Sequence, residues 1–512
     1  GSGTLGGLVR VLTKQPKLET HEGSFSVDLA DVSRAGLRQR YDAMVNLPLS
    51  ETVAMRAVAS IRDEQGWVKN PLLGTENSSD DWNGRVALLW QPNERFDLKL
   101  EAIHQDSDPE DGDAWNPDLG RYLRNTIITE ERKTVFTQLN TTLTYAFEEF
   151  ATLTSSTNLQ KTESNWLLQA GQIPGIGTLL NQSDPFDTDF FSQELRLVSD
   201  SNGRLSWVAG AFYSDVKTRD GNFKFILDGL TDFADLVIAP GVVTSDTIFS
   251  GPQSIFSSEL AVYGDITYEL TDAWSASLGV RAFEFESKLI DKGATTFDFA
   301  SFQNLNLPPF VNQQEDQDMT WRGVLSFKPS ADQHYYFNVS RGYRVGQVNP
   351  NFGPSFVDPS DVVIASSYDS DQTINYELGL KNQLLDDRLL LNAALYFVDW
   401  TDVQVDALRP SDQRNFIANA GDAESKGLEL EAIFSVTPQL DVRLTASWQD
   451  AEIVNISPIN SLLSGARVGD DLPGTPKYLF SGQVNYSLNL NSDTNVDVYA
   501  ATQWVGESVN RF

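Results

Sequence analysis

The sequence predicts an all-β protein, a transmembrane antiparallel β-barrel, on three observations. Apolar residues recur at every second position in many segments of the chain. The connections between these segments alternate between short and long. No stretch approaches the roughly 18 uninterrupted apolar residues of a membrane-spanning helix, whereas a barrel strand needs only about 10 residues with every second one apolar.

The period of two gives each segment one apolar and one polar face. In the segment 259–270, Leu260 and Ile266 share one face, and Asp265 and Thr267 share the other. Successive side chains of a strand point to opposite faces, so this pattern predicts strands rather than helices. The same alternation recurs at 274–282, 428–436, 440–449 and 483–490.

The connections also indicate a barrel in a membrane. Short ones lie at 48–51, 91–94, 271–272, 385–388 and 437–439. Long, polar segments dotted with aromatic residues lie between them, at 63–81, 106–131, 164–188, 219–254, 291–316, 346–370 and 454–475. Outer-membrane barrels have short turns on the periplasmic side and long loops outside, whereas a soluble sandwich has no reason to sort its loops in this way.

Composition excludes several classes of protein. There are 38 basic and 71 acidic residues, so the net charge of -33 makes nucleic acid an unsuitable partner. Disorder is excluded because 40% hydrophobic and 11% aromatic residues can fill a core. The chain has no cysteine, which excludes disulfide scaffolds, thiolate metal sites and cysteine nucleophiles.

Motifs for a catalytic, cofactor or metal site are weak. The glycines of GSGTLG, at 1–6, match a dinucleotide-binding fingerprint by letter, but that motif needs a helix after it, and the residues up to Pro16 have the pattern of a strand. The carboxylate-rich segment 106–118 has its glycine one position too late for an EF-hand, which leaves irregular Ca²⁺ binding as an open alternative to a solvated loop. His21, His104 and His334 are far apart, and we expect no catalytic residues, cofactor or resident metal.

Several motifs resemble those of TonB-dependent outer-membrane receptors. Residues 1–16, GSGTLGGLVRVLTKQP, resemble the end of the plug domain of that family. The segment 375–405 resembles its Tyr-Glu-x-Gly strand with a tight turn and an aromatic-rich return strand. Further segments that fit the family, in the expected order, are RGYRVGQVNP (341–350), NAGDAESKGLELEA (419–432) and LPGTPKYLFSGQVNYSL (472–488).

The resemblance implies two domains, the C-terminal end of a plug at 1–18 and a β-barrel of the 22-stranded type at 19–512. About nineteen strands can be counted, from one near 23–31 to one near 494–504. Bacterial single-chain barrels have even strand numbers, so we expect about three further strands at the C-terminus. An open sheet leaves unpaired backbone groups on its outer strands, and we expect the first and last counted strands to be these edges.

The resemblance also implies a function, the active import of a scarce nutrient across the outer membrane of a Gram-negative bacterium. The most expected cargo is a ferric siderophore or other iron complex, and glycans, cobalamin and haem are the alternative cargoes. The implied partners are TonB with its inner-membrane complex, the small-molecule ligand, and outer-membrane lipid and lipopolysaccharide. A passive porin-like channel and a secreted all-β adhesin or enzyme remain the alternatives.

Candidate ligand contacts are arginines and aromatic residues in or beside the long loops, because binding sites combine aromatic side chains with a few polar groups. One group lies where a strand meets a long loop and comprises Arg341, Tyr343, Arg344 and Asn349. The other candidates are Trp115, Arg121, Tyr122, Arg124, Trp166 and Tyr368.

Overall fold

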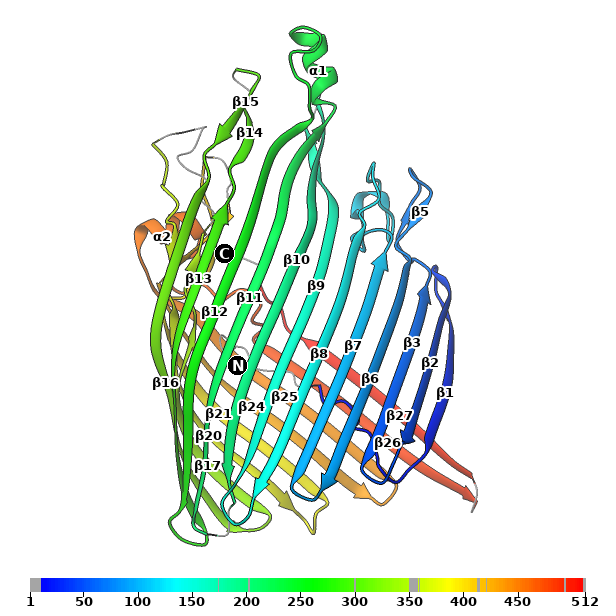
Figure 1. Cartoon of the computed structure of the whole chain (residues 1–512), viewed down its shortest axis with the longest axis vertical. Helices are drawn as coiled ribbons and strands as arrows, with labels where there is room; N and C mark the ends of the chain where they lie inside the picture. The colour runs from blue at the N-terminus through cyan, green and yellow to red at the C-terminus, as the bar shows by residue number, and fades with distance from the viewer. Residues whose placement is uncertain are drawn as a thin grey trace.

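The computed structural model describes residues 11–173, 175–200, 203–298, 301–349, 358, 360–411, 415–419, 421–491 and 494–509. Neighbouring strands pair antiparallel and curve into a barrel wall (Figure 1). Among these residues, the main sheet has 21 strands, including the short β14–β15 hairpin, so nineteen strands form the wall, as the sequence predicts. Three two-stranded ribbons in the same ranges lie outside the main sheet.

The first half of the wall comprises β1 (Glu22–Val32), β2 (Gly36–Pro48), β3 (Val53–Glu64), β6 (Ser79–Asn93), β7 (Phe96–Pro109), β8 (Arg132–Phe147), β9 (Ala151–Ile173), β10 (Gly177–Ser199), β11 (Leu205–Asp228) and β12 (Thr247–Glu269). The second half comprises β13 (Trp274–Asp291), β16 (Phe310–Ser330), β17 (Gln333–Arg344), β20 (Asp371–Leu384), β21 (Leu389–Thr401), β24 (Gly421–Thr437), β25 (Leu440–Ile456), β26 (Tyr478–Asn491) and β27 (Thr494–Val505). The minor strands, all in loops, are β4 (Lys69–Asn70), β5 (Thr75–Glu76), β14 (Ala294–Asp298), β15 (Gln303–Leu307), β18 (Gln347–Val348), β19 (Ser367–Tyr368), β22 (Gln404–Leu408) and β23 (Asn415–Asn419).

Each wall strand between the first and the last pairs with the wall strands before and after it, which makes a simple meander. β1 pairs with β2, and β27 pairs with β26. Within the described ranges no ladder joins β1 to β27, so these two strands are the edges of the sheet, as expected from the sequence.

The alternating pattern decides which side chains face outward. On β12, Leu260, Val262 and Ile266 are 54%, 57% and 54% exposed on the outer surface. Asp265, between them in sequence, faces inward and pairs with Arg322 of β16. The predicted parity is therefore confirmed on this strand, and an exposed apolar exterior is what a strand needs in order to lie against lipid.

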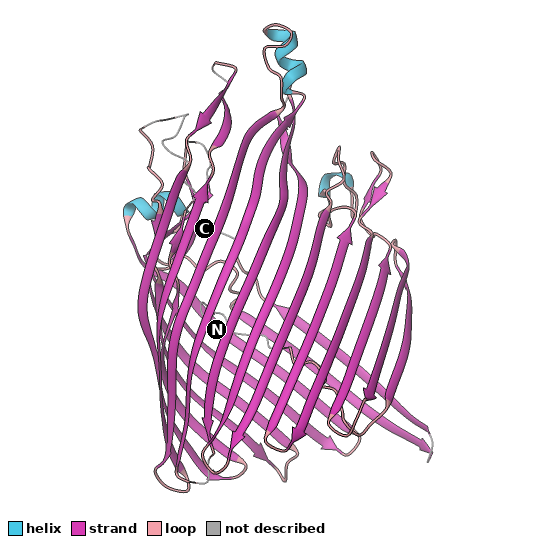
Figure 2. Cartoon of the chain, viewed as in Figure 1, coloured by secondary structure: helices cyan, strands magenta, loops and turns pink. Residues whose placement is uncertain are grey.

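All short turns lie at one end of the barrel and all long connections at the other (Figure 2). The long end holds the helices of the described ranges, η1 (Pro117–Leu119), α1 (Leu230–Val237) and α2 (Pro458–Ser464). Among the described residues, no helix is long and apolar enough to cross a membrane. The long end is called the loop end below.

The structure corrects the predicted pattern of connections at 164–188 and adds one long connection that the sequence did not predict. The segment 164–188 is not a loop, because β9 and β10 continue through it and pair almost to their shared turn. Both faces of this hairpin extension carry polar residues, so it lacks the apolar alternation by which strands are recognised in sequence. The long connection between β21 and β24, which contains the β22–β23 hairpin, was not anticipated.

The segment before β1 is irregular where it is described, at 11–20, although the sequence predicts a strand reaching Pro16. Its backbone is held by side chains of the wall instead of by a neighbouring strand. Asn46 of β2 accepts from the Lys17 amide at 2.9 Å and donates to the Lys17 carbonyl at 2.9 Å. Arg85 of β6 donates to the Lys14 carbonyl at 3.2 Å. The first ten residues of the expected plug remnant lie outside the described part.

Candidate functional site

A cluster of aromatic and arginine side chains forms at the loop end, where three connections meet. Tyr122, in the β7–β8 loop, packs edge-on against Trp67 and Trp115, with ring centroids 5.2 and 5.9 Å away. The guanidinium groups of Arg34 and Arg121 lie 5.3 and 4.9 Å from the centre of the Tyr122 ring. These five residues are called the rim cluster below, and they present cations and aromatic faces together.

The rim cluster is held by backbone hydrogen bonds between loops. The Lys69 amide donates to the Tyr122 carbonyl at 3.0 Å, and the Arg124 amide donates to the Lys69 carbonyl at 3.0 Å. Tyr122 has a φ of 66°, a left-handed conformation that a non-glycine residue adopts only where its surroundings impose it. Its ring position is therefore set by the two loops rather than by local preference.

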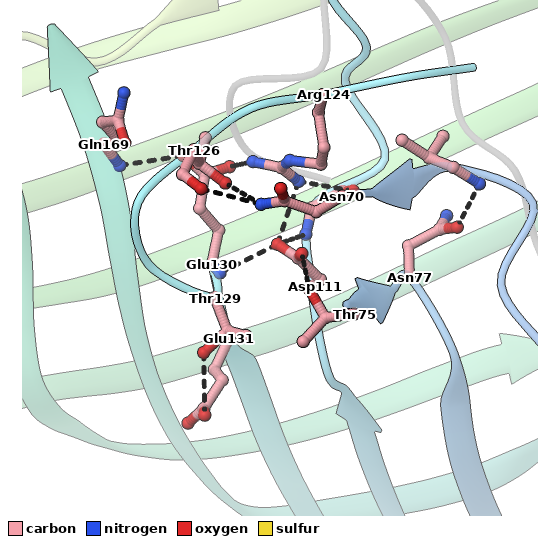
Figure 3. A network of polar contacts seen from close by, with 12 residues as sticks. Asn70, Thr75, Asn77, Asp111, Arg124, Thr126, Thr129, Glu130, Glu131 and Gln169 are labelled. Atoms are coloured by element: carbon pink, nitrogen blue, oxygen red, sulfur yellow. Dashed lines mark hydrogen bonds and ion pairs between the residues drawn. The ribbon is translucent and has the colours of Figure 1, made fainter. Parts of the chain in front are cut away.

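Arg124, two residues after Tyr122, belongs to a network of polar contacts (Figure 3). Its side chain is almost fully buried, lies 3.0 Å from Asp111 and also pairs with Glu130. It donates to the Gly112 carbonyl at 2.7 Å, and Asp111 in turn accepts from the Glu130 amide at 2.9 Å. A buried guanidinium must be paired in this way to offset its desolvation, so Arg124 ties the β7–β8 loop together.

The same network bears on the carboxylate-rich segment 106–118. Asp111 is occupied by Arg124 and by the Thr75 hydroxyl at 3.1 Å, while Asp106 and Asp108 face Lys133 of β8. In the described part of the chain, no group of three or more His, Asp or Glu side chains could hold a metal ion. His104 lies on the outer face with Nδ1 2.8 Å from the Thr137 hydroxyl.

The second predicted group lies at the top of β17. Arg341 binds both carboxylate oxygens of Asp318 at 2.7 Å. Tyr343 is buried and stacks on Phe283 with a centroid distance of 3.9 Å. Arg344 pairs with the buried Asp371. Arg341 thus joins β17 to β16 beyond Arg322, where the ladder between these two strands ends, Tyr343 joins β17 to β13, and Arg344 joins β17 to its partner strand β20.

Arg344, Asn349 and Tyr368 also fix the loops above β17. Arg344 donates to the Gln404 carbonyl at 3.0 Å and lies 5.7 Å from the centre of the Trp400 ring. Asn349 is 1% exposed. Its side-chain nitrogen donates to the carbonyls of Ala365 and Ile417, and its side-chain oxygen accepts from the Ile417 amide, so it joins its own loop to β23. Burial raises the pKa of the Tyr368 phenol, so it stays neutral at ordinary pH.

Trp166 faces the barrel interior and stacks on Phe186, with ring centroids 5.5 Å apart and an angle of 16° between the planes. Gly221 of β11 leaves room for this stack, because a Cβ atom there would lie 1.6 Å from the Phe186 ring. Contact between ligand and any of the ten predicted residues stays a prediction. The structure brings Trp115, Arg121 and Tyr122 together at the rim, Arg341, Tyr343, Arg344, Asn349 and Tyr368 around β17, and leaves Trp166 apart.

Some residues of the loop end were missed in the sequence. Arg34 and Trp67 join the rim cluster from the β1–β2 and β3–β6 connections, and no local motif marks them. A cavity of about 680 Å³ lies between the β21–β24 and β25–β26 loops, and is lined by Trp400, Gln404 and Asp406 among others. The only signal in sequence would have been the length of the 402–420 connection.

Comparisons with known proteins identify the family. A family model described as TonB dependent receptor-like, beta-barrel, matches residues 95–511. The pesticin receptor of Yersinia pestis is 24% identical over 504 residues, which cover 95% of this chain and 65% of that protein. The probable TonB-dependent siderophore receptor PiuA of Acinetobacter baumannii is 24% identical over 328 residues, 60% of this chain and 40% of that protein.

Solved structures agree in fold. The ferric yersiniabactin uptake receptor FyuA from Yersinia pestis has a TM-score of 0.77 at 17% identity, over 96% of this chain and 70% of that one. The siderophore receptor PiuA from Acinetobacter baumannii has a TM-score of 0.68 at 17% identity, over 96% and 72%. The chain thus spans about 65% of the length of the pesticin receptors. Because the family model covers well over half of the chain, the protein belongs to the TonB-dependent receptor-like β-barrel family.

Proposed function

We propose that this protein is a barrel of an outer-membrane receptor that imports a ferric siderophore or other iron complex by TonB-dependent active transport. Its relatives are receptors and transporters, and it is not an enzyme. TonB-dependent β-barrel receptors are outer-membrane proteins of Gram-negative bacteria, and an exterior of exposed apolar side chains suits that location. The energy for transport comes from TonB and its inner-membrane complex.

The rim cluster is the observation that carries the cargo proposal. In the part of the chain that the structure describes, neither Arg34 nor Arg121 makes an ion pair. What distinguishes these two cations is that both lie against the same Tyr122 ring, and that Arg34 also donates to the Arg121 carbonyl at 3.4 Å. Together with three aromatic rings they suit a planar, electron-rich or anionic iron-chelating group, which can stack on the rings and pair with the guanidinium groups.

The relatives' names support the same class of cargo. They include siderophore receptors and a metal-pseudopaline receptor of Pseudomonas aeruginosa, which is 26% identical over 240 residues. Iron limitation should then raise transcription of the gene more than growth on unusual carbon sources does.

Uptake of radioactive iron tests the proposal in a host that lacks its own receptors and expresses the full-length protein. With a panel of ferric siderophores, at least one should enter, and deletion of TonB should abolish its entry. Entry that persists without TonB would indicate a passive porin-like channel. If glycan, cobalamin or haem entered in a TonB-dependent way and no iron chelate did, the proposal of active transport would stand and the proposal of an iron cargo would be wrong.

Point variants locate the contact. Arg121→Gln and Tyr122→Ala should each weaken binding of the accepted chelate about tenfold, because a partly desolvated cation–π contact contributes on the order of 1–2 kcal/mol. Tyr145→Ala, on the outer face near the short turns, is the matched control and should leave affinity unchanged. Equal affinity in all three variants would remove the rim cluster from the site.

A further inference from the structure

The upper part of β16 has a neighbouring strand on one side only. β16 pairs with β13 from Phe327 up to Phe310, close to the loop end (Figure 1). Its ladder with β17, on the other side, ends at Arg322. Among the described residues, no other strand takes the place of β17 beyond that point. The segment 311–319 is therefore a further edge of the sheet, separate from the edges at β1 and β27.

Contacts at two places show which backbone groups of β16 point to this edge. The Lys328 amide donates to the Ala273 carbonyl just before β13 at 2.7 Å, and the register between the two strands does not shift from 327 to 310. Because successive residues of an antiparallel strand pair to opposite sides, the odd-numbered residues point away from β13. Met319 agrees, since its carbonyl accepts from the Arg341 side chain of β17. The residues called the edge residues below are Val311, Gln313, Glu315 and Gln317.

The edge residues differ from other places where one strand outruns its neighbour. Above the β8–β9 ladder the Leu167 amide donates to the Glu131 carbonyl at 3.2 Å, and above the β25–β26 ladder the Ile453 amide donates to the Asp470 carbonyl at 3.0 Å. Loops thus cover those two edges. Within the described ranges, no group donates to or accepts from the backbone of the edge residues on the side away from β13. A row of free N–H and C=O groups is a template for another strand.

The edge lies above the apolar band of the outer face, which consists of the exposed apolar side chains towards the short turns, such as Ile266 and Leu278. Beside the edge the outer face is polar instead, with Gln313, Glu315 and Gln317 exposed. Free backbone groups could not remain in hydrocarbon, but in water they cost little. The edge is therefore open to a partner from the aqueous phase.

The outer face beside the edge is acidic. Glu286 of β13 and Glu315 are direct register partners, and in the part of the chain that the structure describes neither makes an ion pair. Like charges directly opposite each other on a sheet are unfavourable. Glu284 accepts from Gln317 at 3.3 Å, and Lys288 is the basic side chain of the same face, so the face stays negative. A cationic side chain beside Glu315 would be attracted by two carboxylates.

We propose that the edge residues bind an extended basic segment of a partner protein, which adds a strand to β16 and places Lys or Arg at every second position against Glu286 and Glu315. Backbone hydrogen bonds to the edge supply affinity in this mode, and the alternate side chains supply selectivity. A second copy of this chain fits less well, because pairing two such edges brings two acidic faces together. The surface is separate from the rim cluster and does not depend on the cargo.

Binding of labelled peptides to the full-length protein in phosphatidylcholine nanodiscs tests the proposal. The probe is a peptide of about eight residues, close to the length of the edge, in which Lys and Thr alternate. One comparison peptide carries N-methyl groups on its Lys residues and the other on its Thr residues, so both have the same charge. Lys side chains reach the two glutamates only when the Lys N–H groups face β16, because directly opposed residues share a face.

Methylation of the Lys residues should weaken binding about tenfold or more, and methylation of the Thr residues should change it by less than about twofold. Gln313→Pro should also weaken binding several-fold, because it removes one N–H from the edge and none from the ladder with β13. The Glu286→Gln/Glu315→Gln variant should lose affinity for the unmodified peptide. Its matched control is Glu51→Gln/Glu94→Gln, which removes the same charge from exposed positions in two short turns and should keep the affinity.

The comparison of the two methylated peptides uses the wild-type protein, so a misfolded variant does not decide the outcome. Equal affinity for both would mean that charge alone attracts the peptide, and would overturn the proposal. Failure of the unmodified peptide to bind would do the same. A dimer of the full-length protein that Gln313→Pro dissociates would assign the edge to a second copy, and the proposed basic partner would be wrong.

Discussion

The lower and upper parts of β13 differ in which face is apolar. In the lower part Leu278 and Val280 point outward and are exposed, while Arg281 points inward. In the upper part Phe283, Phe285 and Leu289 point inward and are buried, while Glu284 and Glu286 point outward. The strand keeps its period of two, but the apolar side changes between residues 280 and 283.

This reversal shows that the surroundings of each part of the strand decide which of its two faces is apolar. Below, the exterior meets hydrocarbon and the interior is polar. Above, the exterior meets water, and the inner face packs on Tyr343 of β17 and on Val345 just after it to make an ordinary buried core. The membrane boundary can therefore be placed on β13 at the point of reversal.

The largest expected effect follows from the upper core. Phe283→Ala should lower the free energy of unfolding by about 3–5 kcal/mol, because it removes a buried ring stacked on Tyr343 and leaves a cavity. Glu284→Ala, on the outer face one residue later, should change it by less than about 0.5 kcal/mol. Urea titration of the full-length protein in lipid vesicles measures both. Similar losses for the two variants would mean that the upper part has no such core.

The lower part predicts a second, somewhat smaller effect. Ile266→Lys should cost about 2–4 kcal/mol, because it places a charge on the lipid face near the middle of the band. Ser258→Lys, eight residues along the same face and beside the outward Asp215, should cost no more than about 1 kcal/mol, since it lies above the apolar band. The same urea titration applies, and a larger cost at position 258 than at 266 would reverse the assignment of the band.

The smallest effect is a pH dependence in the loop above β21. Burial, together with the nearby carboxylates of Asp422, Asp369 and Asp371, raises the pKa of Asp402. The folded loop therefore binds the proton more tightly than the unfolded chain, so the stabilisation is present at low pH and is lost as pH rises through the raised pKa.

Amide hydrogen exchange at 403–408, corrected for the intrinsic rates, should accordingly be slower near about pH 4 than at about pH 7. The Asp402→Asn variant should lose this dependence while keeping protection. An unchanged dependence in that variant would assign the effect to another group.

The wall was predictable because its signal is local. Leu260 and Asp265 reveal their faces through their spacing alone, and the short turns mark where strands reverse. The extension at 164–188 was not predictable, since water on both sides removes the alternation. The sequence also could not show that Arg124 and Asn349 are buried while Arg121 is exposed. Burial there depends on contacts between different loops, such as Arg124 with Asp111 and Asn349 with Ile417.

The rim cluster shows the same limit. Trp115, Arg121 and Tyr122 were selected by residue type and loop position, and the structure brings them together. Arg34 lies 81 residues before Trp115 in the sequence, and Trp67 lies 48 residues before it. Only the pairing of β1, β2, β3 and β6 brings Arg34 and Trp67 beside Tyr122.

The position of the membrane boundary on β13 can be measured directly with single spin labels at the outward positions Leu278, Val280, Glu284 and Glu286 of the full-length protein in lipid vesicles. Oxygen concentrates in hydrocarbon, and a water-soluble nickel chelate stays in the aqueous phase. We expect collisions with oxygen to dominate at 278 and 280, and collisions with the nickel chelate to dominate at 284 and 286. Dominance of the same reagent at all four positions would contradict the account, because the outer face of β13 would then not pass from lipid to water.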